Sequence, residues 1–144
     1  EEVVRRHAGI VAAADATRDD LLRAWPGVLS RAAPPELLEE LLNIAADNTG
    51  RVHPGGYRAM AHSMAEADLR HVLPEIRVPT LLLYGELDER SPLSVAEELR
   101  RQIRGAKLVV IPGVGHLANA EAPTDFNRHV RRFIKGVRIQ DLGS

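Results

Sequence analysis

The sequence predicts an α/β fold in which a mainly helical N-terminal part precedes two parallel strands with flanking helices. Residues 1 to about 70 carry apolar side chains at helical spacing and show no strand pattern. Two short apolar runs follow, over residues 80–84 and 107–111, and the segment between them has the periodicity of a helix. A strand, a helix and a second strand in this order are typical of a right-handed crossover between parallel strands.

Length and composition are those of an ordinary globular protein. The chain has 144 residues, of which 44% are hydrophobic and 27% charged, enough for a real core. The formal net charge is −1 and basic residues alternate with acids, so we expect neither nucleic acid nor a membrane as partner. The chain has no cysteine, which excludes disulfides and thiolate metal sites. We expect no cofactor and no metal, and a cytoplasmic location.

The N-terminal part is expected to form a helical subdomain over residues 1–75. Breaks at Pro26-Gly27 and Pro34-Pro35 separate its first helices. The expected helices cover residues 2–14, about 20–25, 35–48 and 56–67, followed by a helical turn over 68–73 that Pro74 stops. Four helices before the first strand do not fit a regular alternation of strands and helices.

The second part, residues 76–136, is expected to form strand, helix, strand and helix. The first strand, 80–84, is apolar throughout, as expected when both faces of a parallel strand are covered. Ser91 or Ser94 is expected to cap the crossover helix, which runs to about Ile103. The second strand spans 107–111, and a last helix begins near residues 122–123 and runs to about Lys135. Residues 137–144 are expected to form a tail.

An acid and a histidine follow the two predicted strands. Asp88 comes three residues after Gly85, and His116 comes shortly after Pro112-Gly113. Parallel strands joined by a crossover carry their next loops out at the same end of the sheet, so these two side chains are expected to lie side by side. A carboxylate beside an imidazole is two thirds of a hydrolytic triad.

Two motifs carry a resemblance to a known family. The first, G-x-x-D-x-x-x-P, is met by Gly85, Asp88 and Pro92. The second, G-x-G-H-x-x-x-x-E-x-P, is met by Gly113, Gly115, His116, Glu121 and Pro123. In this order and spacing the chain resembles the C-terminal half of α/β-hydrolase-fold enzymes, with a helical lid followed by the last two strands of the sheet. In motif style it is similar to esterases and enol-lactonases.

The resemblance implies a Ser-Asp-His mechanism on a small ester or lactone. In the family the histidine takes a proton from a serine nucleophile and the aspartate orients the histidine, roles that fall on His116 and Asp88. The serine lies upstream in G-x-S-x-G, and no such motif occurs in these 144 residues. Ser63, expected in mid-helix without a sharp turn, does not fit the role. The isolated chain is therefore predicted to be inactive. The same skeleton also serves dehalogenases, perhydrolases and C–C bond hydrolases.

The other acids and histidines of the chain are expected to have no catalytic or metal-binding role. Glu86 and Glu89 flank Asp88, but only Asp88 has the spacing to both Gly85 and Pro92. Glu121 is expected to have a structural role, complementing the dipole of the last helix at its N-terminus. The other histidines show no spacing typical of metal sites; they are His7, His53, His62, His71 and His129.

Candidate substrate-binding residues are apolar. They are Trp25, Tyr57, Met60, Met64 and Leu117. An apolar stripe on a helix more often packs into a core than lines a pocket, and this reading stays open for the residues of the helical part.

A second hypothesis makes the chain a non-catalytic fragment or binding module. Two strands are too few for a stable sheet, and the strand over residues 80–84 lacks its expected second neighbour. An exposed strand edge invites pairing with another chain. We therefore expect pairing along this strand with the missing N-terminal half or with a second copy in a homo-oligomer.

Overall fold

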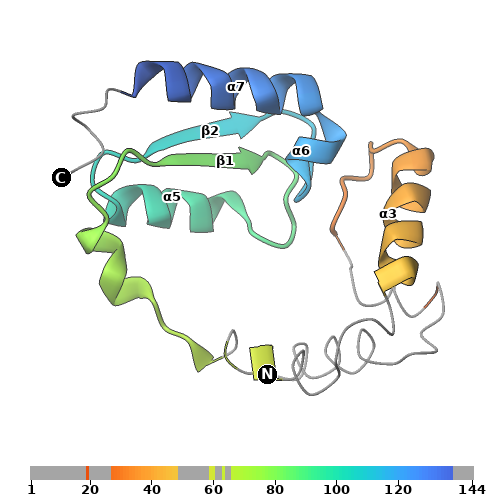
Figure 1. Cartoon of the computed structure of the whole chain (residues 1–144), viewed down its shortest axis with the longest axis horizontal. Helices are drawn as coiled ribbons and strands as arrows, with labels where there is room; N and C mark the ends of the chain where they lie inside the picture. The colour runs from red at the N-terminus through yellow and green to blue at the C-terminus, as the bar shows by residue number, and fades with distance from the viewer. Residues whose placement is uncertain (1–18, 20–26, 49–58, 61–62, 64–65, 138–144) are drawn as a thin grey trace. The chain divides into compact units, whose positions relative to one another are not determined.

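The computed structural model describes residues 19, 27–48, 59–60, 63 and 66–137 (Figure 1). The helices expected over 2–14 and about 20–25 and the tail from 138 to 144 lie outside these residues. The chain divides into two compact units, one of residues 1–26 and 35–68, the other of residues 27–34 and 69–144. The assignment of residues 1–75 to a lid stays a prediction.

The first unit contains the helix α3, Pro35–Asn48, as expected. Proline is favoured in a first helical turn, where its missing N–H has no intrahelical partner to lose. Leucines at positions 37, 38, 41 and 42 give α3 one apolar face, and Leu42 is buried. Residues 59–60, 63 and 66 are also helical, inside the helix expected over 56–67.

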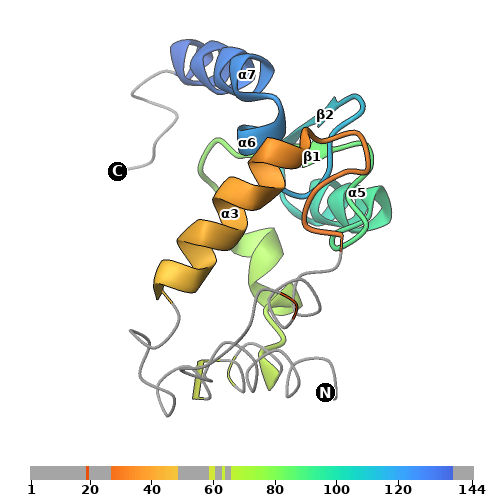
Figure 2. The same ribbon diagram turned by 90° about the vertical axis from the view of Figure 1, so that its right-hand side faces the viewer.

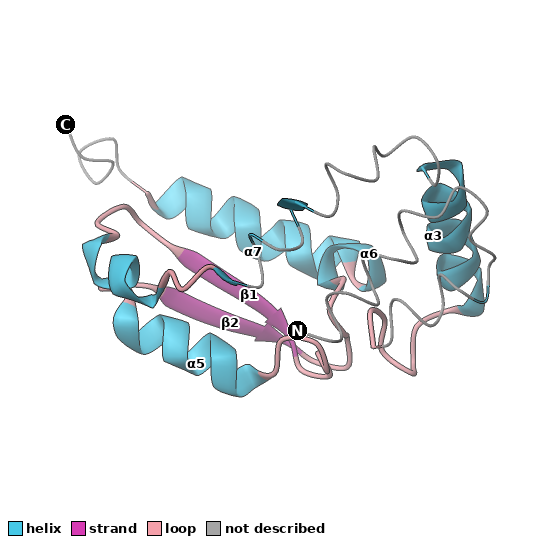
Figure 3. Ribbon diagram, turned by 90° about the horizontal axis from the view of Figure 1, so that it is seen from below, coloured by secondary structure: helices cyan, strands magenta, loops and turns pink. Residues whose placement is uncertain are grey.

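The second unit holds a parallel strand pair, β1 (Leu81–Gly85) and β2 (Lys107–Ile111). Leu81 pairs with Lys107 and Gly85 with Ile111, so the strands are in register and their carboxyl ends are level. The two arrows point the same way in Figure 3. The predicted parallel pair is confirmed, with β1 shifted by one residue from the expected 80–84.

Two helices cover the pair from opposite sides. These are α5 (Leu93–Gln102), which makes the crossover, and α7 (Pro123–Gly136), and each contacts both strands. Figure 1 shows the sheet between them, and Figure 2 shows the same layers from the carboxyl ends of the strands. Covering both faces explains why β1 is apolar at every position before its glycine.

The expected cap of α5 is wrong. The residue before the helix is Pro92, which makes no side-chain capping bond, and Ser94 lies inside the helix. The N–H of Ser91 instead donates to a carboxylate oxygen of Asp88 over 2.8 Å. The loop before α5 is therefore ordered by the aspartate rather than by a serine cap.

Two short helices depart from expectation. The 3₁₀ helix η1, Arg70–Glu75, continues through Pro74, where the helical turn was expected to stop. Its hydrogen bonds run from Val72 N–H to Leu69 O and from Ile76 N–H to Leu73 O. Neither bond needs an N–H from the proline, so the proline does not end the helix. The four-residue helix α6, Ala118–Glu121, follows the histidine loop and was not predicted. None of the helices among the described residues is long and apolar enough to cross a membrane.

The core beneath the carboxyl ends of the strands is small and apolar. Its buried members are Ile111, Val114 and Ala118, and Leu83, Ala122 and Phe126 pack against them. Ile111 ends β2, while Val114 and Ala118 lie on either side of His116 in the chain. The histidine loop is therefore held to the sheet by apolar side chains on both sides of the histidine.

Shortening Ile111 to alanine is expected to cost about 2–5 kcal/mol of unfolding free energy, since the side chain is 2% exposed and its loss leaves a cavity. Urea unfolding followed by circular dichroism measures the change. The matched control is Val110→Ala, because its neighbour in the same strand is 37% exposed and is expected to change stability by less than about 1 kcal/mol. Equal losses in the two variants would contradict this assignment of the core.

Candidate active site

The loops after β1 and β2 are joined by hydrogen bonds that extend beyond the strands. The N–H of Glu86 donates to the carbonyl of Ile111 over 2.9 Å, and the N–H of Leu87 donates to Val114 O over 2.8 Å. The N–H of Gly113 donates to the Glu86 carboxylate over 2.9 Å. The two loops therefore form one connected layer at the carboxyl end of the sheet.

Asp88 is held in place by the backbone of its own loop. Its Oδ1 accepts the N–H groups of Arg90, at 2.9 Å, and Ser91, at 2.8 Å. The other oxygen, Oδ2, lies 2.9 Å from Nδ1 of His116. The Asp88 side chain is only 5% exposed. Two backbone donors on one oxygen orient the carboxylate so that the second oxygen faces the imidazole.

The neighbouring acids do not take this role. The Glu86 carboxylate accepts the N–H of Gly113, and both Glu86 and Glu89 are exposed. Asp88 is the acid among the described residues that bonds to His116. The spacing argument that chose Asp88 over its neighbours therefore agrees with the geometry.

His116 presents one ring nitrogen to Asp88 and leaves the other available. Its side chain is 39% exposed. Nδ1 faces the Asp88 carboxylate, whereas Nε2 has no hydrogen-bond partner within the described part of the chain. An imidazole whose Nδ1–H is held by a carboxylate carries its lone pair on Nε2, the arrangement that a general base requires.

Gly85 is required by a close approach of the two loops. A Cβ at this position would lie 2.2 Å from the carbonyl oxygen of Gly115 and 2.4 Å from that of Val114. The spacing of the motif does not report such a contact. The backbone angles of Gly85 are not of the left-handed kind, whereas Gly113 has a φ of 72°. The chain turns directly after Gly85, where the N–H of Asp88 donates to the carbonyl of Gly85, but the close approach rather than a left-handed backbone explains why this position is glycine.

Glu121 has partners that the sequence analysis did not identify. Its carboxylate accepts the N–H of Gly115, at 2.9 Å, and both the N–H and the hydroxyl of Ser30. Ser30 was expected inside the helical region, but it lies before α3 in the unit that contains the strands. The position of Glu121 in the second motif was the one sequence signal for this contact.

The predicted substrate-binding residues are only partly described. Leu117 directly follows His116 and is half-buried. Met60 lies in the first unit and is 51% exposed. Trp25, Tyr57 and Met64 lie outside the described residues. The lining of a substrate pocket by these residues stays a prediction.

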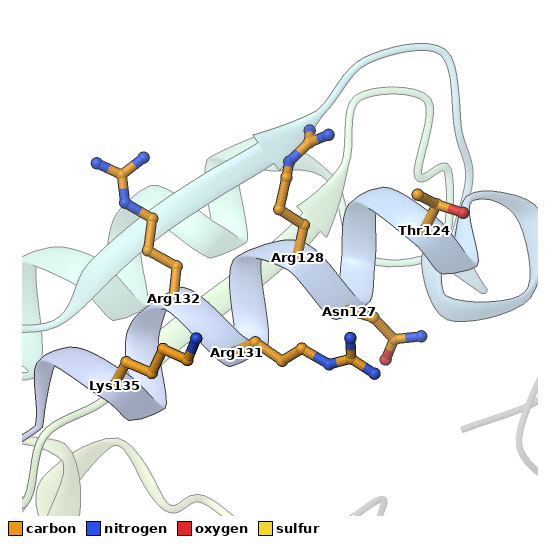
Figure 4. Close-up of a pocket in the computed structure, with 6 residues that line it drawn as sticks. All are labelled: Thr124, Asn127, Arg128, Arg131, Arg132 and Lys135. Carbon is orange, nitrogen blue, oxygen red and sulfur yellow. The ribbon is translucent and has the colours of Figure 1, made fainter.

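Two pockets among the described residues do not include Asp88 or His116. The larger, of about 640 Å³, runs along α7 and is lined by Thr124, Asn127, Arg128, Arg131, Arg132 and Lys135. Figure 4 shows that Arg128 and Arg132 extend from one side of α7 and Arg131 from another. The basic side chains of this pocket are exposed, and Arg128 pairs with Asp125 over 2.7 Å, so this pocket indicates a solvated helix face. Among the described residues no cluster of three or more histidines and acids is able to hold a metal ion.

Comparison with known proteins concerns the family and the fold of the chain. Residues 2–129 match the model of the alpha/beta hydrolase family. The chain is 35% identical over 101 residues to the AB hydrolase superfamily protein YisY of Bacillus subtilis, a match that covers 69% of this chain and 35% of YisY.

Two further relatives carry named activities. The pimeloyl-[acyl-carrier protein] methyl ester esterase of Neisseria meningitidis serogroup A is 34% identical over 93 residues, covering 62% of this chain and 29% of the esterase. The 3-oxoadipate enol-lactonase 2 of Acinetobacter baylyi is 30% identical over 101 residues, covering 70% of this chain and 36% of the lactonase. The chain thus spans about a third of the length of these curated relatives.

Among solved structures, a thermophilic esterase from Thermogutta terrifontis superposes with a TM-score of 0.76 at 28% identity. The match covers 93% of this chain and 49% of the esterase. The two strands and their flanking helices therefore have the fold of that esterase.

Gly85→Ala is expected to lower the unfolding free energy by about 1–3 kcal/mol, because the new methyl group forces the Asp88 and His116 loops apart. The matched control is Gly136→Ala at the end of α7, where a Cβ meets no atom within 4 Å. Thermal unfolding measures the stability. Two-dimensional NMR follows the amides of residues 113–117, which are expected to shift only in Gly85→Ala. Unchanged amides and unchanged stability in that variant would rule out the close approach.

Proposed function

Because the chain belongs to the alpha/beta hydrolase family, we propose that Asp88 and His116 are the acid and the base of a Ser-Asp-His hydrolase. The observation that carries the proposal is the 2.9 Å hydrogen bond between Asp88 Oδ2 and His116 Nδ1, at the carboxyl ends of two parallel strands. The order of acid before histidine along the chain is that of this fold.

In the proposed mechanism Nδ1 of His116 keeps its proton, while Nε2 takes up a second proton and gives it back. His116 Nε2 takes the proton of the nucleophilic serine as its oxygen attacks the substrate carbonyl, and the imidazole becomes charged. The Asp88 carboxylate stabilises that charge through Nδ1–H. His116 then gives the proton to the leaving alcohol. In the second half a water loses a proton to Nε2, attacks the acyl-serine, and the serine recovers the proton.

A small ester or lactone is the proposed substrate. The named relatives include a methyl ester esterase and an enol-lactonase. Both names denote cleavage of a bond between an acyl carbon and an oxygen, which is the bond that a serine nucleophile breaks through a tetrahedral intermediate. The same fold also serves dehalogenases and C–C bond hydrolases. Assays of the native polypeptide with halogenated compounds and with substrates of C–C bond hydrolases test these reactions directly.

The serine is proposed to come from a part of the polypeptide outside these residues. The 144 residues contain no G-x-S-x-G motif, and they span about a third of the length of the relatives. Ser30 is a poor nucleophile here, because it is 8% exposed and its hydroxyl donates to Glu121. We therefore propose that the isolated chain is inactive and contributes the acid–base half of the site.

Asp88→Asn and His116→Ala are each expected to lower kcat/KM for ester hydrolysis about 10³–10⁴-fold in the native polypeptide that contains this chain, since each removes the oriented base. Chromogenic short-chain esters provide the assay. The control is His129→Ala on α7, which removes a histidine outside the pair and is expected to retain activity. A fully active His116→Ala protein would refute the proposed roles.

A fluorophosphonate probe tests the inactivity of the isolated 144-residue chain. A serine hydrolase with a complete triad reacts with the probe and serves as positive control. We expect no labelling of this chain, because Ser30 is buried and no serine in the described part of the chain bonds to His116. A labelled Ser30 or Ser63, located by mass spectrometry, would contradict the proposal.

A binding role is the second candidate, and one observation favours it. In the described part of the chain the sheet has two strands, so no strand pairs with the outer edge of β1. Unpaired edges are templates for pairing with another chain. We propose that this edge pairs with the N-terminal half of a complete hydrolase or with a second copy of the chain.

Light scattering of the isolated chain is expected to give the mass of a dimer or larger assembly. The register between β1 and β2 turns the N–H of Leu81 away from β2, so Leu81→Pro is expected to weaken the assembly without breaking the strand pair. Val95→Ala on α5, another exposed apolar residue, is the control. A monomer with native-like circular dichroism would argue against edge pairing between copies.

A further inference from the structure

We propose that Glu121 is a positioning residue that ties the segment over residues 27–34 to the histidine loop and so holds His116 against Asp88. The inference rests on the proposed function for its catalytic meaning. The structural part of the inference does not depend on that function, because all the contacts it uses lie within the second unit. Glu121 is the last residue of α6, five positions after His116.

Three donors converge on the Glu121 carboxylate. Oε1 accepts the N–H of Gly115 at 2.9 Å, and the N–H of Ser30 lies 3.2 Å from each of the two oxygens. The hydroxyl of Ser30 donates to Oε2 at 2.5 Å. A carboxylate accepts through both oxygens, so it alone among side chains of this length satisfies all three donors.

The bonded residues lie immediately beside the histidine. Gly115 directly precedes His116 and is anchored by Glu121, while Leu117 directly follows His116 and its N–H donates to Val28 O over 3.3 Å. The backbone on both sides of His116 is therefore attached to the segment over 27–34, once directly and once through Glu121. Movement of that segment is transmitted to the imidazole.

The segment over residues 27–34 passes very close to the backbone of Gly115. A Cβ on Gly115 would lie 2.5 Å from the N atom of Ser30 and 2.9 Å from Oε1 of Glu121. Ser30 is buried, so its N–H and hydroxyl need partners within the protein. The carboxylate thus supplies the acceptors that this close approach of two backbones requires.

The alternative role for Glu121 is favourable charge at the start of α7. That helix begins at Pro123, and within the described part of the chain the Glu121 carboxylate bonds to Ser30 and Gly115 rather than to amides of α7. The two roles make different demands on the side chain. A helix dipole needs only a negative charge nearby, whereas the three converging donors need both the charge and the reach of glutamate.

Three variants of the full 144-residue chain separate the roles. Glu121→Gln keeps the reach and removes one acceptor oxygen and the charge, Glu121→Asp keeps the charge and shortens the reach, and Glu97→Gln on α5 is the matched surface control. Amide hydrogen exchange measured by NMR reports whether the N–H groups of Gly115 and Ser30 remain hydrogen-bonded. The low-field Nδ1–H resonance of His116 reports the bond to Asp88.

Both Glu121 variants are expected to speed exchange of the Gly115 and Ser30 amides about tenfold or more. They are also expected to broaden or remove the Nδ1–H resonance of His116. The Glu97→Gln control is expected to change neither readout. A Glu121→Asp protein that retains native exchange and resonance would overturn the inference in favour of the dipole role. So would a loss of stability in both variants with the Nδ1–H resonance intact.

Ester hydrolysis by the native polypeptide provides a separate readout. Glu121→Gln is expected to lower kcat about tenfold or more with little change in KM, because it misplaces the base rather than removing substrate contacts. Absence of activity in the parent protein would refute the proposed function and leave the NMR test of Glu121 in force. Wild-type kcat in a variant that has lost the Nδ1–H resonance would overturn the positioning role.

Discussion

The parallel, in-register pairing of β1 with β2 is the constraint on which the rest of the site depends. Because Gly85 lies opposite Ile111, both strands end at the same level and their loops leave the sheet together. The hydrogen-bond pattern then continues past the strands, from Glu86 N–H to Ile111 O and from Leu87 N–H to Val114 O. A change of register by one residue would move the Asp88 loop relative to the His116 loop and break their contact.

Within that frame the site is built mostly from backbone. Two backbone N–H groups orient the Asp88 carboxylate. The backbones of the two loops approach so closely at Gly85 that a Cβ would not fit. Near His116, the Glu121 carboxylate accepts two backbone amides. Backbone groups have few degrees of freedom once strands and turns have formed, so they hold the Asp88–His116 pair at low entropic cost. This explains how a pair with one partly exposed member keeps a defined geometry.

Family membership and geometry support each other at different levels. The alpha/beta hydrolase match and the superposed esterase concern the fold and the general chemistry. The Asp88–His116 contact concerns the proposed acid–base pair itself. The pocket along α7 includes neither residue of this pair, and its basic side chains are exposed to solvent.

The sequence by itself determined the strand pair, the helix α3 and the placement of Asp88 beside His116, because strand period, glycine breaks and parallel topology are local or nearly local properties. Only the tertiary structure decided the shape of the layer around that pair. The bond between Ser30 and Glu121 joins residues 91 positions apart, and no spacing rule reports a contact that depends on how two segments pack. The same holds for Gly85, whose missing side chain makes room for Gly115 across the loops.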